Sequence, residues 1–148
     1  MATFSANRKA TFDYEILETY DAGLRLFGHE VKSIIHKAPN LAGAFVIIRG
    51  EEAYLINFLI PPYQANNLPK SYEEGRAIKL LLKKAELQHL LGVAQTKGLT
   101  LIPLKLYNKG RSVKLEFGVA RHKKLHDKRA AISKREAQRD IERTLKEE

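Results

Sequence analysis

Three observations predict a small, mainly β protein with helices and a distinct C-terminal tail. Apolar and polar residues alternate in several short segments, which is the period of a strand. Turn-forming residues join most of these segments as hairpins. Beyond residue 120 the composition changes, and charged residues become dense. About six hairpin-linked strands with one late helix favour a closed barrel of the OB-fold type, because closure removes exposed sheet edges. The tail is expected to be helical or disordered.

The N-terminal third of the chain predicts a hairpin and a short helix. Strands are expected at residues 12–16 and 24–27, on either side of a turn at residues 20–23. The apolar residues of segment 29–37 have the i, i+3, i+4 spacing of a helix, and Pro39 ends it. Within that helix, Val31 is expected to pack while Glu30 and its neighbour Lys32 face solvent.

Two further hairpins and a longer helix are predicted after residue 43. The first hairpin joins strands 44–49 and 53–60, and residues 61–75 have the composition of a loop. The Leu80–Leu82 run leads into a helix at about 83–97, which has one apolar face. Three successive leucines in a strand could not all face one side, so Leu81 is a candidate for exposure. The last hairpin joins 101–107 to 113–119.

The charge distribution divides the chain into a body, a junction and a tail. The formal net charge is +9. Residues 121–129 hold five Lys/Arg and two His against one acid, which is the densest cationic run. Residues 130–148 hold five basic and five acidic residues, with a narrow apolar stripe that is marginal as an isolated helix. We therefore expect a barrel at 1–120, a basic junction at 121–129 and a tail at 130–148.

Composition and motifs argue against several classes of protein. There is no cysteine, so disulfides and thiolate metal sites are excluded. No signal peptide or membrane-spanning run is recognisable, so the chain is expected in the cytoplasm. No phosphate loop, nucleophile elbow or HExxH motif occurs, so we predict neither an enzyme nor a cofactor. His122 and His126 have helical metal-pair spacing, but the surrounding cations oppose a dication.

The strongly basic balance points toward an anionic polymer. A sequence pI near 9.8 favours nucleic acid or an anionic surface as the partner. Lysines and arginines suit phosphates, and the flat His126 ring could stack on an unpaired base. The junction by itself fits a solvated linker equally well.

A series of short motifs occurs in a fixed order over nearly the whole chain. The most specific motifs are the Gly-x-Glu-Val-Lys-Ser block at 28–33 and the Lys-Lys-x-His-Asp-Lys-Arg block at 123–129. The others are Asn7-Arg8-Lys9-Ala10, Asp21-Ala22-Gly23, Asn40-Leu41, Lys79-Leu80-Leu81-Leu82 and Pro103-Leu104-Lys105-Leu106-Tyr107. This series resembles the small protein B (SmpB) family, the tmRNA-binding proteins of bacterial trans-translation.

The resemblance implies both the partners and the residues that meet them. The partners would be the tRNA-like domain of tmRNA and the small-subunit rRNA of a stalled ribosome, with the protein monomeric in the complex. The residues expected to contact tmRNA are Asn7, Arg8, Lys9, Asp21, Lys79, Leu81, Arg121, Lys123 and Lys124. Those expected at the decoding centre are His126, Asp127, Lys128, Arg129, Lys134 and Arg135, with the tail lying in the empty mRNA channel.

The sequence also departs from the family pattern, and it leaves two other functions open. The divergent positions are Phe12, His29, Ile35, Ile78, His122 and the loop at 61–75. One alternative is a general OB-fold RNA-binding or ribosome-associated protein. The other is a metal-dependent nuclease that uses Glu30 or Asp21 as a ligand.

Overall fold

The computed structural model describes residues 2–64 and 75–123. Its elements are β1 (Thr3–Ala6), α1 (Arg8–Asp13), β2 (Tyr14–Leu24), α2 (Gly28–Lys37), β3 (Phe45–Arg49), β4 (Glu52–Ile56), β5 (Ile78–Leu81), α3 (Lys84–Ala94), β6 (Leu99–Lys109) and β7 (Ser112–His122). The described part of the chain is thus mainly β with helices, as the sequence predicts, but it has three helices where the sequence indicated two.

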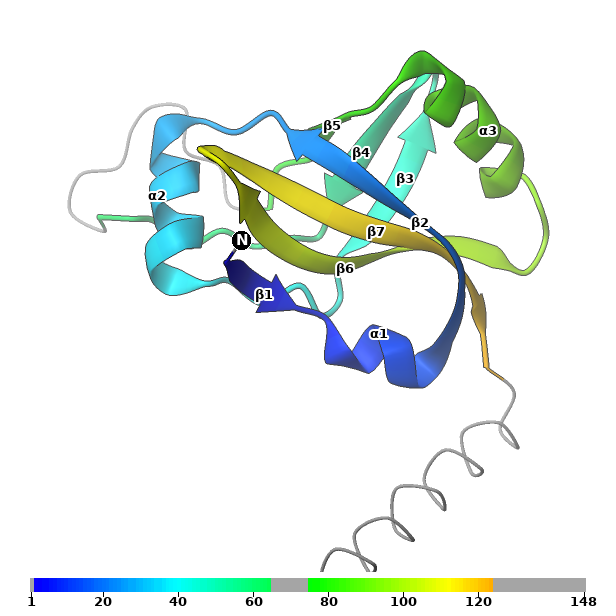
Figure 1. Cartoon of the computed structure of the whole chain (residues 1–148), viewed down its shortest axis with the longest axis horizontal. Coiled ribbons are helices and arrows are strands. Elements are labelled where there is room, and N and C mark those ends of the chain that lie inside the picture. The colour runs from blue at the N-terminus through cyan, green and yellow to red at the C-terminus, as the bar shows by residue number, and fades with distance from the viewer. Residues whose placement is uncertain (1, 65–74, 124–148) are drawn as a thin grey trace, which may run out of the picture.

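The strands pair antiparallel in one seven-stranded sheet. Their order is β1-β6-β3-β4-β5-β2-β7, and β7 pairs in turn with β6. The long β2, β6 and β7 form one curved wall, and the shorter β3, β4 and β5 form the other (Figure 1). The seam between β3 and β6 is registered at one residue pair only, Val46 with Leu101. Because that seam is so short, full closure of the barrel stays a prediction.

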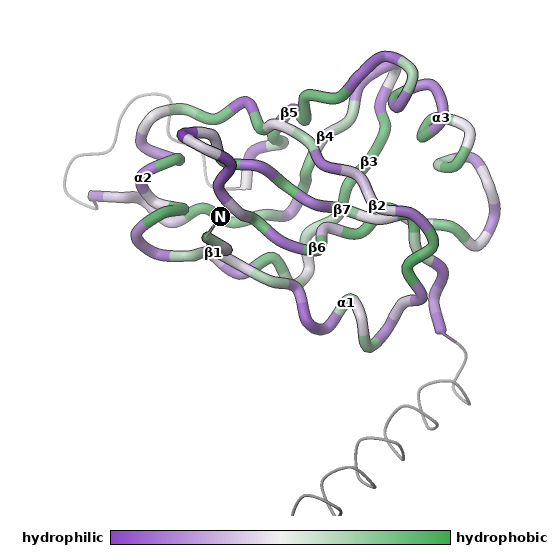
Figure 2. Tube along the Cα trace, viewed as in Figure 1, coloured by the Kyte–Doolittle hydropathy of each residue, from purple (hydrophilic) through white to green (hydrophobic). Residues whose placement is uncertain are grey.

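The core lies between the two walls. It contains fully buried side chains from β4, β6 and β7, among them Leu55, Leu106 and Phe117. The strands alternate between hydrophilic and hydrophobic residues along their length (Figure 2), so that one face of each turns inward. In β5, Leu80 is 2% exposed whereas Leu81 is 49% exposed. The predicted outward placement of Leu81 is therefore confirmed.

The predicted N-terminal hairpin is wrong, because residues 14–24 form the single strand β2. Tyr14 pairs with His122 at one end of β7 and Gly23 pairs with Lys114 at the other. Asp21, Ala22 and Gly23 have turn-forming character, but continuous pairing with a neighbouring strand overrides that local preference. The chain before β2 holds β1 and α1, which the sequence interpretation missed.

Two other segments differ from their predicted form. The strand expected at 53–60 ends at Ile56, where Asn57 takes a positive φ of 56° that breaks the ladder. The helix expected at 83–97 is capped at Lys83, whose backbone N–H donates a hydrogen bond to the Glu86 carboxylate, but it ends at Ala94. No described helix is long and apolar enough to cross a bilayer.

Glu30 is buried, so its predicted exposure is wrong. Only 3% of the residue is accessible, and its carboxylate accepts hydrogen bonds from the Arg76 guanidinium and from the Phe27 backbone N–H. Arg76 also lies over the Phe27 ring, 4.6 Å from its centroid. The buried ion pair thus fastens the start of α2 to the segment that leads into β5. Val31 packs against the core as predicted.

Candidate nucleic-acid interface

Asp21 lies on the outer face of β2 with its carboxylate held in place. Its Oδ1 accepts a hydrogen bond of 2.6 Å from the Tyr107 hydroxyl on β6. Burial, then this hydrogen bond, raise the pKa of Tyr107 to about 12. The phenol therefore stays a donor over the neutral range, and Asp21 presents a fixed acceptor to solvent. Such an oxygen can accept from a base amino group or a ribose 2′-OH.

Leu81 and Lys79 lie on β5, the strand that pairs with β2. Gly23 and Leu81 are paired residues of β2 and β5, so exposed Leu81 lies next to the strand that carries Asp21. Lys79 makes an ion pair with Glu52, 2.7 Å from Nζ to Oε1. That hydrogen bond, together with one from Tyr54, lowers the pKa of Glu52. Lys79 is therefore already engaged, which the sequence did not reveal.

Asn7 has a structural place, while Arg8 and Lys9 are exposed. Asn7 is 9% accessible, and it caps α1 by accepting a hydrogen bond from the Ala10 N–H at 3.3 Å. Its amide nitrogen donates to the Pro103 carbonyl at 2.9 Å. Both ends of the side chain are thus used to dock α1 on β6. Arg8 and Lys9 extend from the first turn of that helix.

The described end of the basic junction packs against α1. The Lys123 ammonium donates to the Thr11 carbonyl at 3.0 Å, and its backbone N–H donates to the Asp13 carbonyl. Arg121 lies within β7 and makes an exposed ion pair with Glu15, 2.6 Å between Nη2 and Oε2. An exposed pair of this kind is worth little. A phosphate could therefore replace Glu15 as the partner of Arg121.

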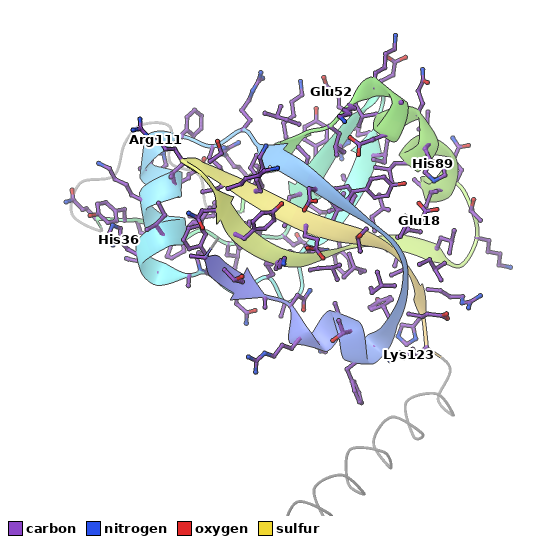
Figure 3. All side chains as sticks on the ribbon, in the orientation of Figure 1. Glu18, His36, Glu52, His89, Arg111 and Lys123 are labelled. Carbon is purple, nitrogen blue, oxygen red and sulfur yellow. The ribbon has the colours of Figure 1, made fainter. Side chains whose placement is uncertain are left out.

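The expected contacts fall into two groups at opposite ends of β2. Nine positions separate Tyr14, near the junction, from Gly23, which is about 30 Å of strand. Figure 3 shows Lys123 at one end of the molecule and Arg111, beside α2, at the other. The structure therefore places Arg8, Lys9, Arg121 and Lys123 at one end, and Asp21, Lys79 and Leu81 toward the other. Lys124, His126, Asp127, Lys128, Arg129, Lys134 and Arg135 lie outside the described residues.

The sequence interpretation missed three residues of this face: Tyr107, Arg111 and Lys114. Tyr107 is in the last motif of the body, but its contact with Asp21 spans 86 positions and has no local signature. Arg111 is in the turn between β6 and β7, where a charged residue is ordinary. Lys114 is one member of a regular alternation in β7. Only the pairing of the strands brings these side chains to one wall.

The described residues offer no evident place for a metal. Within 2–64 and 75–123, no group of three His, Cys, Asp or Glu side chains is placed to hold an ion. Glu30 is paired with Arg76, and Asp21 belongs to no such group. The nuclease alternative thus finds no set of metal ligands in this part of the chain.

The fold and this face define a small, basic β domain suited to nucleic acid. The model of the SmpB protein family matches residues 4–147. The chain belongs to the SmpB family.

Individual relatives agree with this assignment. The SsrA-binding protein of Gloeobacter violaceus is 53% identical over 140 residues, which is 95% of this chain and 91% of that protein. The SsrA-binding protein of Thermosynechococcus vestitus is 49% identical over 143 residues, or 97% and 94% of the two chains. A chain of the solved structure "tmRNA-SmpB: a journey to the center of the bacterial ribosome" superposes with a TM-score of 0.67 at 45% identity, covering 81% of this chain and 84% of that one.

Proposed function

We propose that this protein binds the tRNA-like domain of tmRNA and delivers it to stalled ribosomes in the cytoplasm, as a monomer and without catalysing a reaction. The observation that carries the proposal is full-length membership in the SmpB family, whose relatives are named SsrA-binding proteins. The outer face of β2 and β5 supports the proposal, because a fixed carboxylate acceptor, an exposed leucine and nearby cations suit folded RNA.

Each part of the chain has a separate role in this proposal. The body, residues 1–120, holds the tRNA-like domain. Asp21 and Leu81 contact the elbow of that RNA. Lys79 contacts the RNA while it keeps its ion pair with Glu52. Asn7 acts by positioning Arg8 and Lys9, since its own side chain is buried. Arg121, Lys123 and Lys124 neutralise phosphates at the junction, which spans 121–129.

The rest of the junction and the tail, residues 130–148, act on the ribosome. His126 stacks on a base of the small-subunit rRNA at the decoding centre. Asp127, Lys128 and Arg129 lie alongside it, and Lys134 and Arg135 meet phosphates in the empty mRNA channel. Ordering a tail costs about 1–2 kcal/mol per residue in backbone entropy, which such contacts could offset.

A comparison of RNA ligands tests the proposal. We expect tighter binding to the isolated tRNA-like domain of tmRNA than to mature tRNAs or unstructured RNA of equal length. Equal affinity for all three would instead favour a general RNA-binding protein. Incubation of the same RNAs with protein and Mg²⁺ tests for the nuclease, since cleavage products would contradict a purely binding role.

A further inference from the structure

A row of paired residues crosses four neighbouring strands, and one member of the row is a glycine. Leu81 of β5 pairs with Gly23 of β2, Gly23 pairs with Lys114 of β7, and Lys114 pairs with Tyr107 of β6. Paired residues point to the same side of a sheet. Because Gly23 has no side chain, the Leu81 and Lys114 side chains come close together over it: a Cβ there would lie 3.3 Å from the Leu81 Cβ and 3.5 Å from the Lys114 Nζ.

Beside this row lies a pocket of about 230 Å³, which we call the Gly23 pocket. Besides Leu81, Gly23 and Lys114, its lining includes apolar Leu26, just before α2, Val31 within that helix, and Arg111. In Figure 2 the turn between β6 and β7, which carries Arg111, is hydrophilic where it passes α2. The lining of the pocket therefore combines apolar side chains with two cations.

The two cations of the pocket lining, Arg111 and Lys114, are not neutralised by neighbours in the described structure. The lysines and arginines that form salt bridges among the described residues are Arg76, Lys79, Lys105 and Arg121. Arg111 and Lys114 make no ion pair or side-chain hydrogen bond within residues 2–64 and 75–123. Among the described residues, nothing neutralises their charge.

A second, larger pocket of about 640 Å³ lies on the other side of Leu81, against α3. Its lining holds two carboxylates, Glu51 and Glu52, and two lysines, Lys79 and Lys84, so its formal charges balance. The charged residues in the lining of the smaller pocket are Arg111 and Lys114. For an anionic ligand, charge therefore favours the smaller pocket, although it has less volume.

We propose that the Gly23 pocket receives one unstacked base of the tRNA-like domain, with the flanking phosphates on Arg111 and Lys114. A base has an apolar face that fits the lining, and its backbone supplies the two anions. Asp21 lies two residues before Gly23 and so points to the same side of β2. Its Oδ2 makes no hydrogen bond within the described residues and can accept one from the bound nucleotide. This inference rests on the proposed function and specifies how that site grips its RNA.

The test separates the base from the phosphates. Gly23→Ala narrows the pocket without changing charge, because the new Cβ would lie 3.3 Å from the Leu81 Cβ and 3.5 Å from the Lys114 Nζ. We expect it to weaken binding to the tRNA-like domain about tenfold, the size of losing one base contact, with an unchanged salt slope. Arg111→Ala and Lys114→Ala should each lower the slope of log affinity against log salt by about 0.7–0.9.

Lys84→Ala is the matched control, since Lys84 is an exposed cation at the larger pocket. It should leave affinity and salt slope near the wild-type values. Chemical probing of the RNA should reveal a base that wild type and Lys84→Ala protect and Gly23→Ala does not. If Gly23→Ala fails to fold, the salt slopes of the Arg111→Ala and Lys114→Ala variants decide by themselves.

Three results would count against one or the other of two claims. If wild type prefers the tRNA-like domain but the Arg111 and Lys114 variants keep its salt slope, the Gly23 pocket is not an RNA site and the proposed function stands. The same conclusion follows if the slope falls more for Lys84→Ala than for either, which would assign the RNA to the larger pocket. If wild type has no preference for the tRNA-like domain, the proposed function itself fails.

Discussion

At the residue scale, two contacts made over long sequence distances decide what single side chains do. Tyr107 fixes the Asp21 carboxylate from across the wall, and Arg76 neutralises Glu30 from 46 positions away. Neither contact has a signature in the sequence, which is why Glu30 looked solvent-exposed and Tyr107 looked like an ordinary strand residue. The sequence identified Asp21 as a contact only through the family motif that contains it, whereas the run of three leucines already indicated an exposed Leu81.

The raised tyrosine pKa values predict alkaline destabilisation. Burial first, and then hydrogen bonds to carboxylates, raise the pKa of Tyr107 and of Tyr20 to about 12. A raised pKa means that folding favours the neutral phenol, so this stabilisation is complete below about pH 10 and is lost as pH rises through about 12. Unfolding free energy should therefore fall over that window, less steeply in Tyr107→Phe. Denaturant titrations at several pH values measure the unfolding free energy of wild type and of Tyr107→Phe. If both proteins lose stability equally steeply between about pH 10 and pH 12, Tyr107 is not the source of this pH dependence.

Loss of the buried ion pair should cost stability. Glu30→Ala leaves the Arg76 guanidinium, whose side chain is 18% exposed, without its carboxylate. We expect the free energy of unfolding to fall by about 3 kcal/mol, the usual effect of removing one partner of a buried pair. Urea denaturation measures this, with the exposed Glu51→Ala as control. Equal midpoints for the two variants would mean that the ion pair does not hold α2.

At the element scale, strand pairing rather than local preference determines the wall that carries the site. Alternation predicted β7 and the hairpin around residue 110 well, because a half-buried strand has a period of two. It failed for β2, where turn-forming residues lie within the strand. The capping signal of Asn7 was present before α1, but the short helix has few residues to make a periodic pattern. The lining of the Gly23 pocket comes from β2, β5, β7, α2 and their flanking residues, and no local pattern in the sequence predicts that these segments meet.

Alanine substitutions at two glycines should change stability in opposite directions, because Gly118 lies where β2 and β7 approach closely and Gly92 lies in open space. A Cβ at Gly118 would lie 2.8 Å from the Ile16 Cγ2 and 2.9 Å from the Glu18 carbonyl oxygen. Backbone cannot easily move aside, so Gly118→Ala should destabilise by about 1–3 kcal/mol. Gly92 lies in α3 with open space around it, so Gly92→Ala should stabilise by about 0.5–1 kcal/mol. Thermal melting of both variants would contradict this packing if their midpoints shifted in the same direction.

At the scale of the whole molecule, the described contacts divide between two ends of one wall. The end near α2 offers a fixed carboxylate, a leucine and an apolar pocket, which suits recognition of a folded RNA. The other end offers the start of the basic junction, held to α1 through Lys123. We therefore infer that the body and the start of the junction hold tmRNA without the tail, and that the rest of the junction and the tail serve the ribosome.

The most direct test of this division compares the full chain with a chain truncated after Arg129. Two quantities are measured together: affinity for the tRNA-like domain by gel shift, and transfer of alanine to a stalled nascent chain. We predict that truncation leaves the affinity within about threefold, because few phosphate contacts are lost, and abolishes alanine transfer. A loss of affinity of about tenfold or more, equivalent to roughly 1.4 kcal/mol, would contradict the account. Normal alanine transfer by the truncated protein would contradict it equally.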